Sequence, residues 1–101
     1  MLGNIHHFIG STEKALEEYQ EAIKLSPNNA ILYGLLGSTY IEIKLYDKAV
    51  EAFKKGIEFA PNNALLHYEL GATYFDKGLI PQAIKEMQEA LRIDPGYEEA
   101  K

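Results

Sequence analysis

The chain has 101 residues, 47% of them hydrophobic and 25% charged, so it has room for one domain of ordinary globular composition. Ten Lys and Arg against 15 Asp and Glu give a formal charge of −5, which argues against a nucleic-acid binder, and the absence of Cys excludes disulfides and thiolate metal sites. No apolar run approaches the roughly 20 residues that span a bilayer, and the start lacks the pattern of a signal peptide. We therefore expect a cytoplasmic protein with neither a nucleic acid nor a membrane as its partner.

Apolar residues recur at steps of three and four through most of the sequence, which is the spacing of amphipathic helices. Leu32, Leu36 and Tyr40 follow this spacing, and so do Ala49 and Phe53. No segment alternates clearly with the period of a strand. In chain order, the pattern predicts helices over 2–9, 12–25, 30–43, 47–59, 64–77 and 81–93.

Residues suited to helix starts stand ahead of several of these segments. Thr12 is expected to cap the second helix, and the asparagines at 28–29 and 62–63 are expected to cap the third and fifth. Pro81 fits the first turn of the last helix, where its missing N–H leaves no hydrogen bond unmade. Short turns join the helices, so neighbours should run antiparallel.

A period of 34 residues organises the whole sequence. Pro27, Pro61 and Pro95 are spaced by 34, and such a period indicates a repeat architecture. Glycines preceded by Leu recur with the same spacing at 3, 37 and 71. Lys44 stands at a turn where the other copies have glycine, so we expect that turn to be tighter or strained.

The landmarks within each period resemble the tetratricopeptide repeat signature. They read Tyr33-x2-Leu36-Gly37-x2-Tyr40, Ala49-x3-Phe53 and Pro61, and the next copy runs from His67 to Pro95. His6 and His67 occupy aromatic positions of this signature, where we expect them to be core residues. The resemblance covers residues 2–97.

The resemblance implies an all-α fold, an α-solenoid of antiparallel helix pairs wound as a right-handed superhelix. Residues 1–101 would form a single domain. It would hold a partial first repeat over 1–29, whole repeats over 30–63 and 64–97, and a stub of a following helix over 98–101.

In this family the first helix of each repeat lines a concave groove that binds peptides. Here a second apolar stripe on those helices supports such a surface. We expect a non-enzymatic adaptor that binds an apolar or basic-apolar peptide or helix of another protein. The expected groove residues are Asn4, His7, Phe8, Ile31, Gly34, Leu35, Ser38, Ile41, Glu42, Leu65, Tyr68, Glu69, Ala72, Phe75 and Asp76.

One family ligand can be tested on the residues themselves. Repeats that hold the acidic tails of heat-shock chaperones use a clamp of Lys, Asn and Arg. Asn4 matches one Asn of that clamp, but Leu35, Leu65 and Glu69 stand at other clamp positions. Glu69 would repel a carboxylate. The sequence therefore predicts that the clamp is absent.

No constellation of catalytic residues is recognisable, and we expect no catalytic site, no metal site and no cofactor. The acidic side chains of the second helices, Glu86 and Glu89 among them, are expected on solvated faces among lysines and arginines. His6 and His7 are adjacent, so they point to different sides of a helix and cannot form a ligand pair.

A second hypothesis is structural. The last helix carries Ile84, Leu91 and Ile93, and no polar capping helix follows them. Since terminal repeats need such a cap for solubility, the chain is either a segment of a longer array or a self-associating repeat segment that forms a homo-oligomer through its uncapped ends.

Overall fold

The computed structural model describes the backbone of residues 2–96 and the side chains of residues 11–96. The described residues form helices and no strand, which confirms the all-α helical-repeat fold. The last four helices begin and end within one residue of their expected bounds. The five helices are α1 (Leu2–Leu25), α2 (Ala30–Glu42), α3 (Tyr46–Phe59), α4 (Ala64–Asp76) and α5 (Ile80–Ile93).

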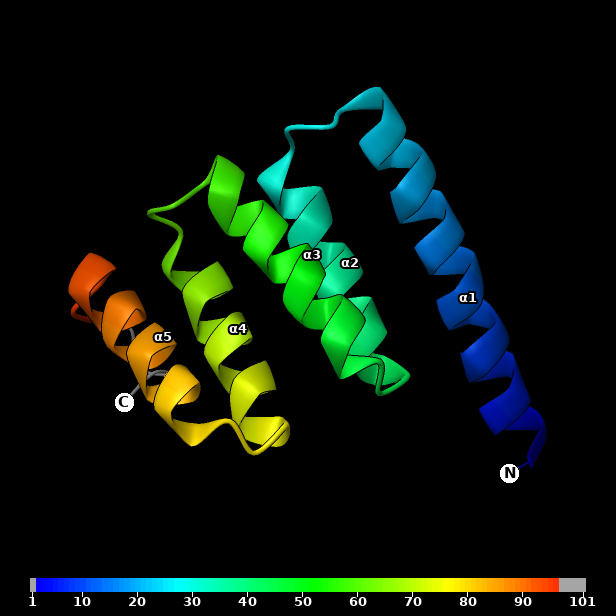
Figure 1. Ribbon diagram of the computed structural model, residues 1–101. Helices are drawn as coiled ribbons and strands as arrows, with labels where there is room; N and C mark the ends of the chain where they lie inside the picture. Colours follow the sequence, from blue (N-terminus) through cyan, green and yellow to red (C-terminus); the bar gives the residue numbers. More distant parts are fainter. Residues whose placement is uncertain (1, 97–101) are drawn as a thin grey trace.

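The helices lie side by side in chain order. The α2–α3 and α4–α5 pairs have the most extensive packing, and α1 and α3 also pack against the helices that follow them. In Figure 1, α1 and α5 lie at opposite ends of the array, so neither can cover the other. The arrangement is one of pairs stacked on pairs, as the 34-residue period predicts.

The start of the chain differs from the sequence prediction. The turn expected near Gly10 and the cap expected at Thr12 are wrong, because α1 is one helix of 24 residues and Thr12 is buried within it. A separate helix over residues 2–9 would be too short to be stable by itself. Continuing through Gly10 costs about 1 kcal/mol of helix propensity but preserves the hydrogen bonds that a turn would break.

The two predicted asparagine caps are confirmed at Asn29 and Asn63. The Oδ1 of Asn29 accepts hydrogen bonds from two backbone amides of α2, at 3.0 and 3.3 Å. Asn63 Oδ1 accepts one from the amide of Leu66 in α4, at 3.1 Å. Pro81 lies in the first turn of α5, as expected. Both α2 and α4 therefore start at positions that the sequence itself specifies.

The turns inside the two helix pairs share one backbone conformation. Lys44 has φ of +61° and Gly78, 34 residues later, has φ of +81°. In each turn the next amide donates to the carbonyl five residues back, at 2.9 and 2.8 Å. This pattern is the Schellman motif, in which glycine is the favoured residue. The strain predicted at Lys44 thus has a physical origin, since its Cβ crowds the backbone at positive φ.

The core lies where the two helix pairs meet. Phe53 of α3 is fully buried, and a Cβ built on Gly37 of α2 would lie 2.7 Å from its ring. Glycine at this position is what lets α2 and α3 approach so closely. The buried cluster around Phe53 comprises Ala49, Phe53, Leu66, Leu70, Tyr74 and Ala83.

Candidate functional site

A hollow of about 170 Å³ lies between α2 and α4, the first helices of the two complete pairs. The two helices contact each other directly. They come together at Gly34, where a Cβ would lie 3.0 Å from the side chain of Leu66. The residues that line the hollow are Ala30, Ile31, Gly34, Leu35, Ser38, Asn63, Leu65, Leu66 and Glu69.

The walls of the hollow are aliphatic and open to solvent. Ile31 and Leu35 of α2 are 69% and 42% exposed, and Leu65 of α4 is 47% exposed. Ile31 and Leu35 are one helical turn apart, so they form a continuous edge along α2. Three large, exposed apolar side chains at one opening form an apolar patch, and such a patch is typical of a surface that binds a partner.

One polar contact crosses the hollow. The hydroxyl of Ser38 on α2 donates to Glu69 Oε2 on α4, at 3.1 Å. Glu69 is half-buried. The lining therefore contains a carboxyl group next to its apolar walls.

Six of the expected groove residues meet at this hollow. They come from both helices, as expected for a surface made by the first helix of each repeat. The six are Ile31, Gly34, Leu35, Ser38, Leu65 and Glu69.

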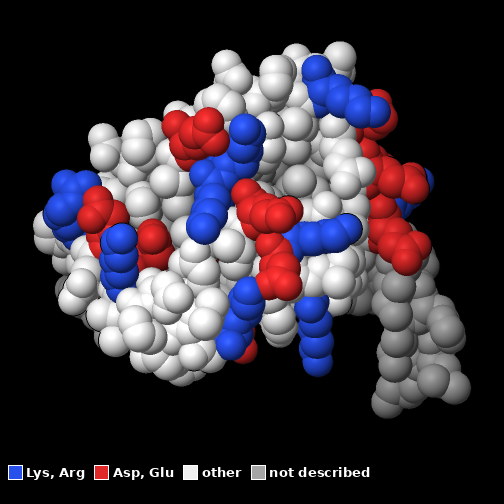
Figure 2. Space-filling view, viewed as in Figure 1, with Lys and Arg blue, Asp and Glu red and all other residues white. Residues whose placement is uncertain are grey.

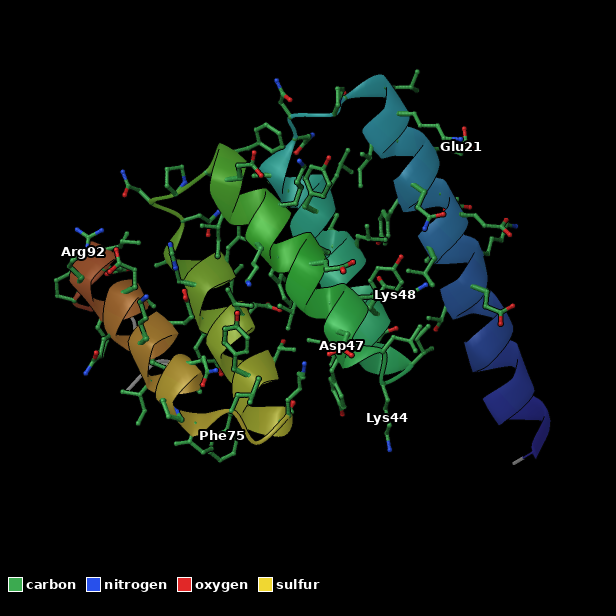
Figure 3. All side chains as sticks on the ribbon, in the orientation of Figure 1. Glu21, Lys44, Asp47, Lys48, Phe75 and Arg92 are labelled. Atoms are coloured by element: carbon green, nitrogen blue, oxygen red, sulfur yellow. The ribbon has the colours of Figure 1, made fainter. Side chains whose placement is uncertain are left out.

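The other expected groove residues lie elsewhere. Ile41 is half-buried and packs against the core cluster. Phe75 is 62% exposed and lines a second hollow against α5; Figure 3 shows it at the end of α4 beside the turn into α5. Glu42 and Asp76 are exposed at the last residues of α2 and α4. Tyr68 and Ala72 are half-buried on α4; the side chains of Asn4, His7 and Phe8 lie outside the described residues.

Three residues of the lining were missed by the sequence reading. Leu66 follows the core stripe of α4, yet it also forms part of the hollow's wall. Ala30 and Asn63 stand at the first turns of α2 and α4. The sequence correctly predicted Asn63 as the N-cap of α4. It could not predict that Asn63 also lines the hollow, because that depends on how α2 and α4 pack.

A second polar contact corrects the expectation for Glu86. Its Oε1 lies 2.8 Å from Nδ1 of His67, and its side chain is only 19% exposed, so Glu86 is not on a solvated face. The Nε2 of His67 lies 2.8 Å from the carbonyl oxygen of Pro61. His67 itself is buried, as expected for a residue at a core aromatic position.

Charges elsewhere are mixed and exposed. Figure 2 shows Lys and Arg side chains interspersed with Asp and Glu on the face in view. In the last turn of α5, Arg92 Nε donates to Glu89 Oε1 at 2.8 Å. This hydrogen bond holds the pKa of Glu89 below its ordinary value and raises the pKa of Arg92. Neither group lines the hollow.

Other site types are not indicated in the described part of the chain. There, no group of three His, Asp or Glu side chains is arranged to hold a metal ion. No helix in the same part is both long and apolar enough to cross a membrane.

Comparison with known proteins places this geometry in a family. A model described as TPR repeat matches residues 3–44 and 37–78, and a tetratricopeptide repeat model matches residues 64–97. The chain belongs to the tetratricopeptide repeat family. The signature in the sequence is thus confirmed over nearly its whole length.

Solved structures share the tetratricopeptide repeat fold. Two crystal structures of MamA match with TM-scores of 0.84 and 0.82 at 29% and 30% identity, covering 99% and 97% of this chain. This chain spans only 58% and 54% of those MamA chains. The first TPR of Spaghetti (RPAP3), solved with the HSP90 peptide SRMEEVD, matches at 0.86 with 21% identity, covering 97% of this chain and 78% of its own. No curated protein shows a significant sequence match.

Proposed function

We propose that this tetratricopeptide repeat chain is a non-enzymatic protein-interaction module, and that the hollow between α2 and α4 accepts an apolar side chain of a basic peptide or helix. The family assignment supports a protein-interaction role. The observation that carries the finer proposal is the aliphatic hollow with an acidic residue in its lining.

The size of the hollow favours a side chain over a small molecule. Pockets for drug-sized ligands occupy about 300–1,000 Å³, whereas this one occupies about 170 Å³. A volume of that order suits one leucine- or phenylalanine-sized group. Burial of such a side chain contributes about 1.5–3 kcal/mol, so one anchor gives weak binding and further contacts along α2 and α4 are required.

The charges favour a basic partner. Glu69 lies in the hollow, and Glu42 and Asp76 are exposed at the C-terminal ends of α2 and α4. The whole chain carries a formal charge of −5. Lys or Arg beside the apolar anchor would gain from these carboxylates, and acidic segments would be repelled.

The residues of the hollow also argue against an acidic ligand of the kind bound by the RPAP3 domain. That structure contains the peptide SRMEEVD. In the present chain Leu35, Leu65 and Glu69 occupy positions where the family's carboxylate clamp needs polar or basic groups. We therefore expect discrimination between basic-apolar and acidic peptides.

A displayed library of random peptides tests the proposal. Panning against the intact chain should enrich peptides that combine a large apolar residue with Lys or Arg. A synthetic peptide of the enriched sequence should bind Leu35→Glu at least tenfold more weakly than the unaltered chain, because the carboxylate disrupts an aliphatic wall.

Leu25→Glu provides the matched control, since Leu25 is 88% exposed at the end of α1 and does not line the hollow. This variant should bind within twofold of the unaltered chain. Circular dichroism spectra should show that both variants remain folded. Enrichment of acidic peptides, or equal affinity for both variants, would contradict the proposal.

A further inference from the structure

A basic hollow lies where the turn between α2 and α3 meets the end of α4. Its volume is about 470 Å³. Figure 3 shows Lys44, Asp47 and Lys48 grouped at this turn and at the start of α3. The lining of the hollow consists of Lys44, Leu45, Tyr46, Asp47, Lys48 and Lys77.

The lining is cationic although the whole chain is acidic. Three lysines and one aspartate give the lining a formal charge of +2, whereas the chain carries −5. Lys77 Nζ forms an ion pair with Asp47 Oδ1. Lys44 and Lys48 have no carboxylate partner among the residues whose side chains the structure describes. Lys48 Nζ lies 5.8 Å from the centroid of the Tyr40 ring, a contact that leaves its charge in place.

The repeat fold does not require these cations. Lys44 and Lys48 correspond to Gly78 and Gln82 at the turn into α5, and both turns have the same backbone hydrogen bonds. Lys44 has a φ of +61°, which disfavours a residue with a Cβ. Lys48 lies in the first turn of α3, where the helix dipole disfavours positive charge. Both lysines therefore occupy positions that cost stability, and strained residues of this kind concentrate at functional sites.

We propose that this basic hollow, with Lys44, Lys48 and Lys77, binds a phosphorylated serine or threonine of a partner protein. A phosphate monoester carries a charge of about −1.5 to −2 at pH 7, which complements the charge of the lining. Each lysine supplies an ammonium group with N–H donors, and the phosphate oxygens are strong acceptors for them. A carboxylate carries less charge and fewer oxygens, so an unmodified acidic side chain should bind more weakly.

The surroundings of the cations favour a protein segment over a free phosphate or a membrane. The hollow also contains Tyr46 and Leu45, which is 42% exposed, so residues beside the phosphorylated side chain would gain apolar contacts. An anionic bilayer would repel a chain whose overall charge is −5. The basic hollow shares no residue with the hollow between α2 and α4, so this inference does not rest on the peptide-binding assignment made there.

An NMR titration of the full, isotopically labelled chain at constant ionic strength tests the site. The probe is a short glycine peptide with one central phosphoserine. Backbone amide shifts around Lys44, Lys48 and Lys77 should change and saturate. The same peptide with glutamate should bind roughly fivefold more weakly because its side chain carries less charge, and the peptide with serine should not bind. Inorganic phosphate should also bind more weakly, because it makes no contacts beyond the cations.

Variants of the lining separate the site from general charge effects. Lys44→Gly and Lys77→Gln should each weaken binding of the phosphoserine peptide by about threefold or more, since each removes one point charge. Lys44→Gly also places the favoured residue in the turn, so its loss of binding would not come from unfolding. Asp47→Asn should strengthen binding by roughly twofold or more, because it frees Lys77. Lys54→Gln, at an exposed lysine of α3 outside the hollow, is the matched control and should bind like the unaltered chain.

Each outcome decides the proposal. The absence of saturable shifts with the phosphoserine peptide would contradict it, and so would equal losses in Lys54→Gln and Lys77→Gln. Equal affinity for inorganic phosphate would overturn the assignment to a partner protein, and so would binding to phosphatidylserine vesicles without binding to the peptide. Leu35→Glu, which alters the α2–α4 hollow, should bind the phosphoserine peptide like the unaltered chain, so failure of one site leaves the test of the other intact.

Discussion

The two helix pairs α2–α3 and α4–α5 make one equivalent contact with different side chains. Tyr33 donates its hydroxyl to the carbonyl of Pro27 at 2.9 Å. Thirty-four residues later, Nε2 of His67 lies 2.8 Å from the carbonyl of Pro61. The repeat therefore preserves a hydrogen bond from the first helix to the preceding proline carbonyl, whereas the residue that donates it can change.

The two pairs also differ in how deeply the second helix buries its core side chain. Phe53 of α3 is fully buried beneath α4, and its counterpart Met87 on α5 remains half-buried and lines an open hollow. The two residues occupy the same register position. Position in the array, as well as the repeat pattern, therefore decides how much a core residue contributes to stability.

The largest predicted effect tests this difference in burial. Phe53→Ala should lower the free energy of unfolding by about 3–5 kcal/mol because it leaves a cavity in a closed core. Met87→Ala should cost about 1–2 kcal/mol, since part of that side chain already contacts water. Urea unfolding followed by circular dichroism measures both.

Phe53→Leu, with an expected loss of about 1.5 kcal/mol, keeps the comparison measurable if the alanine variant does not fold. Equal losses of unfolding free energy for the variants at residues 53 and 87 would show that burial does not set the contribution of these two side chains to stability.

The next effect tests the exchanged hydrogen bond. The carbonyl of Pro61 can only accept, so Nε2 of His67 donates to it, and Nδ1 makes the contact with Glu86 Oε1. His67→Tyr should cost about 2 kcal/mol, because it leaves the half-buried Glu86 without that partner.

The double variant His67→Tyr/Glu86→Ala installs the arrangement of the preceding pair, which has Tyr33 and Ala52 at these positions. It should recover most of the lost stability, so that the two changes are coupled by about 1 kcal/mol or more. Additive losses in the double-mutant cycle would contradict the equivalence of the two contacts.

A smaller effect is expected at the turns. Lys44 adopts a positive φ that glycine adopts at residue 78. Lys44→Gly should raise the free energy of unfolding by about 0.5–1 kcal/mol, since removal of the Cβ relieves more strain than the added freedom of the unfolded chain costs. The reverse change, Gly78→Lys, should destabilise. Thermal unfolding of both variants measures the sign of each change in stability. A loss of stability in Lys44→Gly as well as in Gly78→Lys would contradict this explanation.

The smallest predicted effect on stability concerns an ion pair in the last turns of α1, α3 and α5. The pairs are Glu21–Lys24 in α1, Lys55–Glu58 in α3 and Glu89–Arg92 in α5. The acidic residue comes first in α1 and α5, which places the cation nearer the helix C-terminus, and this order is reversed in α3. The α5 pair therefore has the orientation favoured by the helix dipole.

Arg92→Gln should return the pKa of Glu89 towards its ordinary value, because the Arg92 hydrogen bond is the main cause of the lowering. A lowered carboxyl pKa contributes stability above the pKa of the unfolded chain, and that contribution is lost as pH falls through the folded pKa. The stability difference between the two proteins should therefore vanish in acid. NMR titration of the Glu89 carboxyl provides the direct check, and an unchanged pKa would contradict it.

Most of the fold could be predicted because short stretches of sequence specify where each helix of the repeat begins and ends. The 34-residue period, the apolar spacing and the asparagines at residues 29 and 63 give the bounds of α2–α5 to within one residue. The continuous α1 was missed because Gly10 and Gly78 look alike in sequence. Gly78 adopts a φ of +81° and lies in a turn, whereas Gly10 lies within the helix.

The candidate site was predicted in part for a related reason. Helical spacing correctly grouped Ile31, Leu35 and Leu65 on surfaces that meet. It could not show that Phe75, on the same stripe as Leu65, lies far enough along α4 to face α5 instead. It also could not pair His67 with Glu86, because that contact depends on how two helices pack.

The central claim, that the hollow between α2 and α4 is the peptide-binding site, is tested most directly by NMR. The isotopically labelled chain would be titrated with the synthetic peptide selected from the library, and backbone amide shifts would be followed. The account predicts that the largest changes fall on Ile31, Leu35, Leu65 and Glu69. Changes concentrated on α5 around Ile84 would contradict it.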